Sequence, residues 1–276
     1  MHGIVTRSDL LRAEISDREI EGRVRKGLLI RLHPGVYSVG PRATPEARYL
    51  AAVRACGEGA VLVAMPAGWL FGIVKGRPPL PEVMTRTERR VNGVRTRRCR
   101  RMDRRDTTTH RGIPVTTVPR TLVDLAATLS LTDLARACHE AGVRYRTTPR
   151  KVKAVLERHP KAPGKANLTR VIDGDERVLL SALERSFIEQ LRMNGLPLPI
   201  ANRPAGSKYV DCRWPDHALT VELDSYAFHN SRHSWEQGYR REREARARKE
   251  RFRRFTWADV FEDPAYMLSE LRMLLA

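Results

Sequence analysis

The order of apolar and polar positions in the first forty residues predicts two helices followed by a β-hairpin. Ser8 is expected to cap a helix over SDLLRAEI, and Ser16 and Glu19 have the spacing of a capping box that opens a second helix ending near Lys26. The stretch LLIRLHPGVYSVG predicts two strands that turn at residues 33–35. Two helices and a hairpin follow the order of a winged helix-turn-helix, expected over residues 1–40.

The second predicted helix carries a group of basic side chains. Arg18, Arg23, Arg25 and Lys26 lie on or near it, where a helix that enters the major groove holds its contacts. These four residues are therefore predicted to bind nucleic acid. Winged helices also bind proteins, so a protein-interaction module is the alternative.

Residues 41–160 predict a mixed region of helices and short strands. Helices are expected from Pro45 to Cys56, from Pro119, and over residues 131–142 and 150–159. Between them, Arg86 to Arg105 holds ten arginines against two acids. Two interpretations stay open: a ribbon that faces phosphates, or a solvated sheet edge that discourages pairing with other sheets.

A polar, proline-bearing stretch over residues 159–166 predicts a linker, and the pattern changes after it. Residues 178–194 predict a helix with an apolar stripe, which Glu184 borders. Two short strands are then expected within residues 209–229, joined by a turn at residues 214–216, followed by a core strand over RFRRFTW and a last helix after Pro264. The C-terminal domain is predicted over residues 161–276.

The two strands within residues 209–229 place acidic residues close together. The first strand carries Asp211, and the second carries Glu222 and Asp224, which share a face because they are two positions apart. Neighbouring carboxylates repel unless a cation or a shared proton relieves them. Hard oxygen ligands select Mg²⁺ or Mn²⁺, so the pattern predicts a divalent-metal site.

Residues 239–254, YRREREARARKERFRR, hold nine basic and three acidic residues and predict a basic helix. Glu242 with Arg246, and Glu244 with Arg248, have the spacing of helical ion pairs. The remaining positive charge favours a wall that holds phosphates, with nucleic-acid contacts expected from Arg240, Arg241 and Arg243.

Composition supports a polyanionic partner. The net charge is +19, which opposes compaction unless a partner such as nucleic acid compensates it. Four scattered cysteines without a CxxC pair argue against disulfides or a zinc knuckle. A signal-peptide pattern and a membrane-length apolar run are both missing, so a cytoplasmic protein without a membrane partner is expected.

The stretches GLLIRLHPGVYSVG and GIPVTTVPRTLVDLA resemble the AbiE-type (AbiEi) antitoxins, over roughly residues 1–150. This resemblance implies a DNA-binding regulator. It also implies an antitoxin-like α+β middle region over residues 41–160. Double-stranded DNA is the expected partner, and a cognate toxin or a defence or repair protein is a further candidate.

Residues 176–276 resemble the very-short-patch-repair (Vsr-like) endonucleases of the PD-(D/E)xK, restriction-endonuclease-like superfamily, through ALERSFIEQL, YVDCRWP, TVELDSYAFH and RFTWADVFEDP. By this resemblance Glu184 matches the acid of the first helix and Asp211 the metal-binding aspartate. Asp224 stands where these enzymes have a histidine, and His229 matches their second histidine. The superfamily's lysine should follow Glu222 by two residues, where this chain has Asp224.

The resemblance implies hydrolysis of DNA phosphodiester bonds with Mg²⁺ or Mn²⁺. Asp211 and Glu222 are expected as direct ligands, Asp224 as a ligand or water-positioning residue, and Glu184 as a ligand through water. His229 is expected as the general acid/base.

The expected fold is α/β, or α+β overall, and the expected function is that of a Mg²⁺-dependent DNA endonuclease. The alternative is a non-catalytic, antitoxin-like transcriptional repressor that uses a nuclease fold for binding, and a weaker third hypothesis is an RNA-directed toxin.

Overall fold

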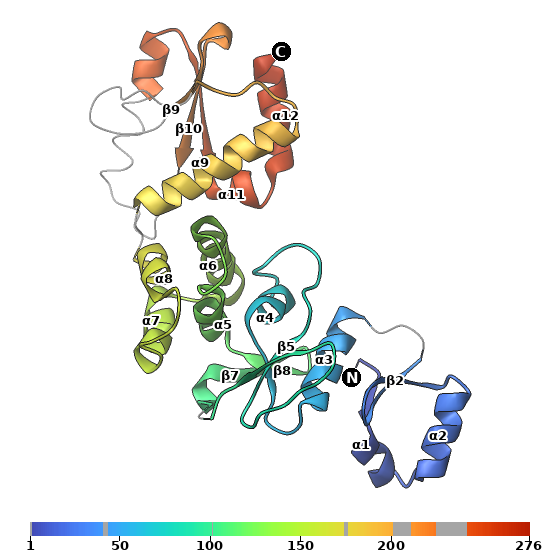
Figure 1. Cartoon of the computed structure of the whole chain (residues 1–276). Coiled ribbons are helices and arrows are strands. Elements are labelled where there is room, and N and C mark those ends of the chain that lie inside the picture. Colours follow the sequence, from blue (N-terminus) through green and yellow to red (C-terminus); the bar gives the residue numbers. More distant parts are fainter. Residues whose placement is uncertain (1, 41–43, 101, 174–175, 201–210, 225–241) are drawn as a thin grey trace. The chain divides into compact units, whose positions relative to one another are not determined.

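The computed structural model describes residues 2–40, 44–100, 102–173, 176–200, 211–224 and 242–276, and the side chains of 176–181, 211 and 224 are outside this description. These residues form two compact units (Figure 1). The first comprises Met1–Leu129 with Ala137–Leu168, and the second Ser130–Arg136 with Thr169–Ala276. Helices accompany three separate sheets in the described residues, which confirms the predicted α+β class.

The N-terminal part of the first unit has the predicted order of a winged helix-turn-helix. The elements are β1 (Ile4–Thr6), α1 (Arg7–Arg12), α2 (Asp17–Arg25), β2 (Leu29–His33) and β3 (Val36–Val39). The three strands form an antiparallel sheet in the order β1-β3-β2. Its core is built from residues of both helices and two strands: Leu10, Ile20, Leu29 and Tyr37.

The helix caps in this part follow local side-chain chemistry. Ser16 and Glu19 form the predicted capping box, each side chain bonding the other residue's backbone N–H. The prediction that Ser8 caps the first helix is wrong. Thr6 is the N-cap, because its hydroxyl accepts from the Asp9 N–H at 3.1 Å while Asp9 accepts from the Thr6 N–H at 2.9 Å.

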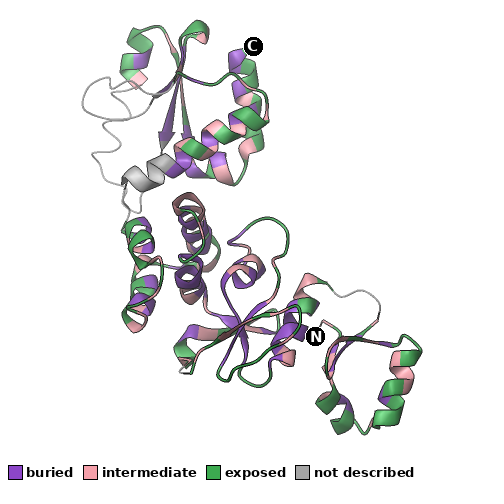
Figure 2. Cartoon of the chain, viewed as in Figure 1, coloured by how far each residue is buried: buried purple, intermediate pink, exposed green. Residues whose placement is uncertain are grey.

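A five-stranded mixed sheet follows, in the order β6-β5-β4-β8-β7. Strands β6 and β7 are the two edges of this sheet. Strand β6 is parallel to its neighbour β5, and β7 is antiparallel to its neighbour β8. Buried residues run along β4, β5 and β8 (Figure 2). The elements of this part are α3 (Pro45–Ala55), β4 (Val61–Leu62), α4 (Ala64–Leu70), β5 (Glu82–Thr85), β6 (Arg95–Arg98), η1 (Arg104–Asp106), β7 (Thr107–His110) and β8 (Ile113–Thr116).

The helices predicted for residues 41–160 are present, as α3 and as α5 (Val118–Leu125), α6 (Leu131–Tyr145) and α7 (Pro149–Arg158). Helix α8 (Lys165–Ile172) follows them and was not predicted. The segment predicted as a linker is a packed turn. A Cβ on Gly164, which has a φ of +74°, would lie 1.9 Å from the carbonyl oxygen of Ala126, so only glycine fits there.

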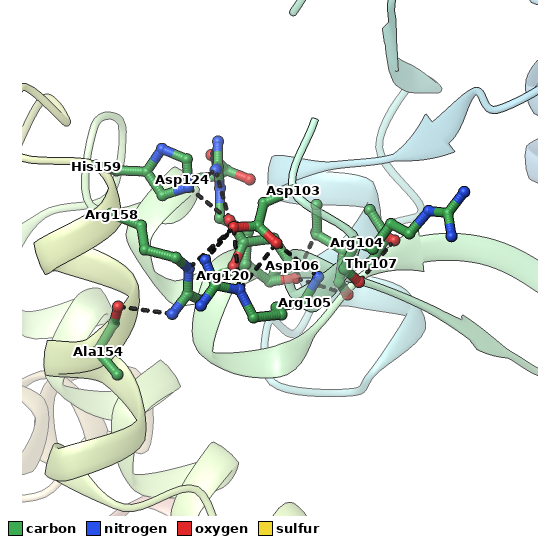
Figure 3. Close-up of polar contacts among 12 residues, drawn as sticks. Asp103, Arg104, Arg105, Asp106, Thr107, Arg120, Asp124, Ala154, Arg158 and His159 are labelled. Carbon is green, nitrogen blue, oxygen red and sulfur yellow. Dashed lines mark hydrogen bonds and ion pairs between the residues drawn. The ribbon is translucent and has the colours of Figure 1, made fainter. Parts of the chain in front are cut away.

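A buried ionic cluster joins α7 to the sheet (Figure 3). Asp106, 2% exposed, accepts from Arg158, from Arg120 at 3.3 Å and from the His159 ring at 2.5 Å. Arg120 also donates to Asp124 at 3.1 Å from two nitrogens. The end of α7 is therefore held by charges that lie almost out of contact with water.

The second unit packs helices on a three-stranded sheet in the order β11-β10-β9. Strand β10 is antiparallel to β9 and parallel to β11. The predicted apolar stripe on α9 is confirmed where side chains are described: Leu183, Phe187 and Leu191 are completely buried. The elements are α9 (Glu176–Met193), β9 (Asp211–Trp214), η2 (Pro215–His217), β10 (Leu219–Asp224), β11 (Arg251–Thr256), α11 (Trp257–Phe261) and α12 (Pro264–Leu275).

The predicted basic helix over residues 239–254 is wrong in its second half. Among the described residues of this segment only 242–247 are helical, and the core strand predicted over RFRRFTW is confirmed as β11, which begins at Arg251. The predicted pair of Glu242 with Arg246 is present at 2.6 Å. Arg248 instead donates to Glu250 at 3.1 Å, since the helix has ended before it. In the described part of the chain, every helix is too short or too polar to cross a membrane.

Candidate nucleic-acid interface and carboxylate site

Helix α2 presents one face to the core and the opposite face to solvent. Ile20 is 1% exposed and Val24 packs on the same core cluster. A helix turns by about 100° per residue, so Arg18 and Arg25 lie on the side away from Ile20. Both arginines are exposed, as the prediction of a groove-facing surface requires.

Ion pairs divide the basic residues of the winged helix into two groups. Arg7 pairs with Asp17 at 2.5 Å, Arg12 with Asp9 at 2.8 Å and Arg31 with Glu21 at 2.6 Å. The basic residues that form no ion pair with any described residue are the four predicted from the sequence, namely Arg18, Arg23, Arg25 and Lys26.

Gly22 lies between Arg18 and Arg25 on the same outward side of α2. A Cβ built on it meets no atom within 4 Å, and its backbone is helical. Glycine in a helix interior costs about 0.5–1 kcal/mol relative to alanine. Neither backbone strain nor packing against the described residues explains it, and the surface at this point of the helix is open. Sequence reasoning missed this position.

The β2–β3 hairpin forms the wing. It turns at Pro34 and Gly35, where Gly35 has a φ of +71°. Burial lowers the pKa of His33 below its usual value, so this ring is neutral at pH 7. Arg31 lies 5.7 Å from the centre of the Tyr37 ring. The wing therefore adds little unpaired charge, and the basic surface of this domain belongs to α2.

The strand register brings two of the predicted metal ligands to opposite positions. Asp211 on β9 pairs with Glu222 on β10, and Asp224 stands two residues further along β10. The side chains of Asp211 and Asp224 are outside the described residues, as is all of His229. The predicted roles of these three residues stay predictions.

Glu222 is already neutralised by a neighbouring strand. It is 7% exposed, and the Arg254 guanidinium donates to its Oε2 from two nitrogens, at 3.0 and 3.2 Å. The parallel register of β10 and β11 places these two residues side by side. A buried carboxylate needs such a partner, so Arg254 relieves the charge that was expected to require a metal ion.

Glu184 is partly buried on α9, and burial raises the pKa of its carboxyl above the usual value. Within the described part of the chain, groups of three or more His, Cys, Asp and Glu side chains arranged to hold a metal ion are not found. The prediction of Mg²⁺ or Mn²⁺ is untested, since two of the expected ligands have undescribed side chains.

The later arginines of the basic segment bind inside their own unit, whereas the contacts predicted from Arg240, Arg241 and Arg243 stay predictions. Arg251 donates to the carbonyl oxygens of Leu274 and His217, at 2.7 and 3.0 Å. Arg253 binds Glu270. Arg243 is exposed, whereas Arg240 and Arg241 lie outside the described residues.

Sequence reasoning also missed a second buried acid in this unit. Glu250 accepts from the Thr220 hydroxyl at 2.6 Å and from Arg213 and Arg248, and these hydrogen bonds, against the opposing effect of burial, lower its pKa. Sequence spacing offered only Arg248 as a partner, because Thr220 and Arg213 lie on β10 and β9, thirty or more residues away.

Residues 1–40 match the family model described as transcriptional regulator, AbiEi antitoxin. The match covers the winged helix-turn-helix and supports the resemblance predicted for this end of the chain. No match to a curated protein was found. The resemblance predicted for residues 176–276 to very-short-patch-repair endonucleases has no support from these comparisons.

Proposed function

We propose that this protein is a DNA-binding transcriptional regulator of the antitoxin type, which places the outward face of α2 in the major groove. One observation carries the proposal: among the described residues of the winged helix, the basic side chains that form no ion pair are those on α2 and at its end, where Arg23 interacts with Glu19 only at longer range. The similarity of residues 1–40 to a transcriptional regulator supports the same function.

The unpaired charges predict how strongly DNA binding depends on salt. Each phosphate neutralised by a cation releases counterions, and log K changes with log salt by about 0.9 per contact. Four contacts from Arg18, Arg23, Arg25 and Lys26 would give a slope of roughly −3.6. Arginines that already hold an acid add less, because their charge is partly cancelled.

The test compares two variants that each remove two positive charges from residues 1–40. R18Q/R25Q changes the unpaired arginines of α2, and R12Q/R31Q changes two arginines that hold acids. Fluorescence anisotropy with duplex DNA should show a loss of at least tenfold, about 1.4 kcal/mol, for R18Q/R25Q and a smaller loss for the control. Equal losses would contradict docking through α2, since they would report only the change in total charge.

A Mg²⁺-dependent endonuclease is the second candidate, favoured by the opposite positions of Asp211 and Glu222 on paired strands. The ion pair of Glu222 with Arg254 argues against it, because the arginine already occupies Oε2 of the carboxylate and offsets the charge that would attract a metal ion. Cleavage of supercoiled, nicked and mismatched duplexes with Mg²⁺ or Mn²⁺ decides between them. Nicking by the wild type that Asp211→Ala abolishes would establish the enzyme; equal nicking by both proteins, or none, would reject it.

A further inference from the structure

The arginine-rich segment between β5 and η1 is folded as a ribbon along one edge of the five-stranded sheet. Strand β6 is an outer strand, and the chain before it doubles back through a bridge between Val91 and Val94. The Thr96 hydroxyl donates to the carbonyl oxygen of Arg89 at 2.6 Å. The first part of the β6 edge is thus covered by the protein's own chain, so protecting an open edge does not account for arginines there.

Some arginines of this segment have a structural role. Glu82 is 5% exposed on β5, and Arg97 and Arg95 of the next strand neutralise it, the latter at 3.7 Å. Arg105 pairs with Asp103 at 2.7 Å. These three guanidinium groups stabilise carboxylates of the fold and are not available as unpaired charges.

The other described arginines of the segment face solvent. Arg90 reaches only Glu88, at 3.9 Å, and both are highly exposed, so water screens that pair. Five exposed arginines form no ion pair with a described residue, and we call them the basic ribbon: Arg86, Arg89, Arg98, Arg100 and Arg104.

Five like charges on one short stretch repel one another, and a polyanion relieves that repulsion. A lipid surface would also need apolar side chains to anchor the protein. Large hydrophobic side chains with high exposure are absent from the described residues between 82 and 106. The guanidinium group matches the geometry of a phosphate through two parallel hydrogen bonds. Charge without an apolar anchor therefore favours nucleic acid over membrane.

We infer that the basic ribbon is a second DNA-contacting surface, which holds the phosphate backbone without reading the base sequence. This inference rests on the DNA-binding function proposed above and extends it beyond residues 1–40. Phosphate contacts position a protein on the duplex, whereas base contacts specify the site. The ribbon supplies the first kind of contact only, whereas α2 supplies phosphate contacts together with the base contacts of the groove.

The full-length chain tests the inference with R86Q/R98Q/R100Q and a matched control, R77Q/R150Q/K161Q. The control removes three positive charges from exposed, unpaired positions of the same unit. Anisotropy with duplex DNA is measured over a range of salt concentrations. For the ribbon variant, the slope of log K against log salt concentration should become shallower by about 0.9 per lost contact, or roughly 2.7 in total. For the control, the slope should change by less than about 1. Unchanged thermal unfolding of both variants shows that the fold is intact.

A ribbon variant with the same slope as the control would overturn the inference. The α2 variant R18Q/R25Q, measured beside them, separates this failure from that of the proposed function. If the salt dependence of binding becomes weaker in the ribbon variant and not in the α2 variant, the basic ribbon is supported as a DNA contact and docking through α2 is wrong. If the ribbon variant instead loses binding to phosphatidylserine vesicles with its DNA slope unchanged, the surface is a lipid site and the inference is wrong.

Discussion

At Gly22, helix stability favours alanine, whereas close approach of the proposed DNA partner favours glycine. Alanine would fit without contact to any atom of the protein, and it would stabilise the helix. Arginines stand four residues before and three residues after it on the outward side. In the proposed docking, a glycine between them would let the helix backbone come close to the edges of base pairs, which is a use of glycine that stability alone does not explain.

Gly22→Ala is predicted to raise the free energy of unfolding by about 0.5–1 kcal/mol and to weaken DNA binding roughly tenfold. Gly142→Ala is the matched control, since Gly142 lies within α6 with only one atom near its Cβ position, 3.8 Å away. That variant should gain stability and keep its affinity. Thermal melts and anisotropy measure both quantities. Unchanged affinity in Gly22→Ala would show that α2 does not approach DNA closely at this point.

The elements of the winged helix could be predicted from sequence because their helix caps and turns are determined by neighbouring residues. The capping box of Ser16 and the turn before Gly35 are set within a few residues. Ser8 was mistaken for a cap because it also precedes an apolar pair, but Thr6 ends a strand and already has the extended backbone that an N-cap needs. Which arginines hold acids depends on contacts ten residues apart, as for Arg31 and Glu21, so spacing could not reveal it.

At the scale of elements, the attachment of α7 depends on Asp106. Burial opposes ionisation of this carboxyl, but hydrogen bonds from Arg158 and His159 outweigh it, and its pKa falls below the usual 3.8. Its contribution to stability is therefore fully present above that value and is lost as the pH falls through the lower, folded pKa. Burial raises the pKa of Asp124 instead, against the effect of Arg120, so its ionised form costs stability once the pH exceeds that pKa.

Asp106→Asn is predicted to lower the free energy of unfolding at pH 7 by about 3–5 kcal/mol, because it leaves Arg158 and Arg120 without their shared carboxylate. Asp124→Asn, the control, should change it by less than about 1.5 kcal/mol. Urea unfolding followed by circular dichroism, at pH 7 and near pH 3, measures both. The loss caused by Asp106→Asn should shrink at the lower pH; a loss that is independent of pH would contradict the ionic role.

In the second unit, local elements could be predicted from the sequence, but the pairing of strands distant in the chain could not. The apolar stripe on α9 and the two strands around the turn follow local patterns, and they are present. The parallel pairing of β10 with β11 joins segments some thirty residues apart, and it alone places Arg254 on Glu222. The core strand predicted over RFRRFTW is present as β11, whereas the predicted basic helix, drawn from the charge of residues 239–254, extended too far into it.

At the scale of the whole molecule, the arginines behind the net charge of +19 have different roles in the two units. In the second unit the described arginines near the acids hold Glu222, Glu250 and Glu270. In the first unit, α2 and the basic ribbon each hold several unpaired arginines, and others such as Arg77 and Arg150 are scattered. The sequence indicated a polyanionic partner from the total charge, and only the ion pairs show which positions remain for it.

Selection of bound duplexes from a random-sequence library, with Mg²⁺ present, tests the central claim most directly. A regulator that reads the groove through α2 should enrich one sequence motif as intact duplexes, and R18Q/R25Q should lose that motif while R12Q/R31Q keeps it. Recovery of the same motif with R18Q/R25Q, or of no motif with the wild type, would contradict sequence-specific regulation through α2.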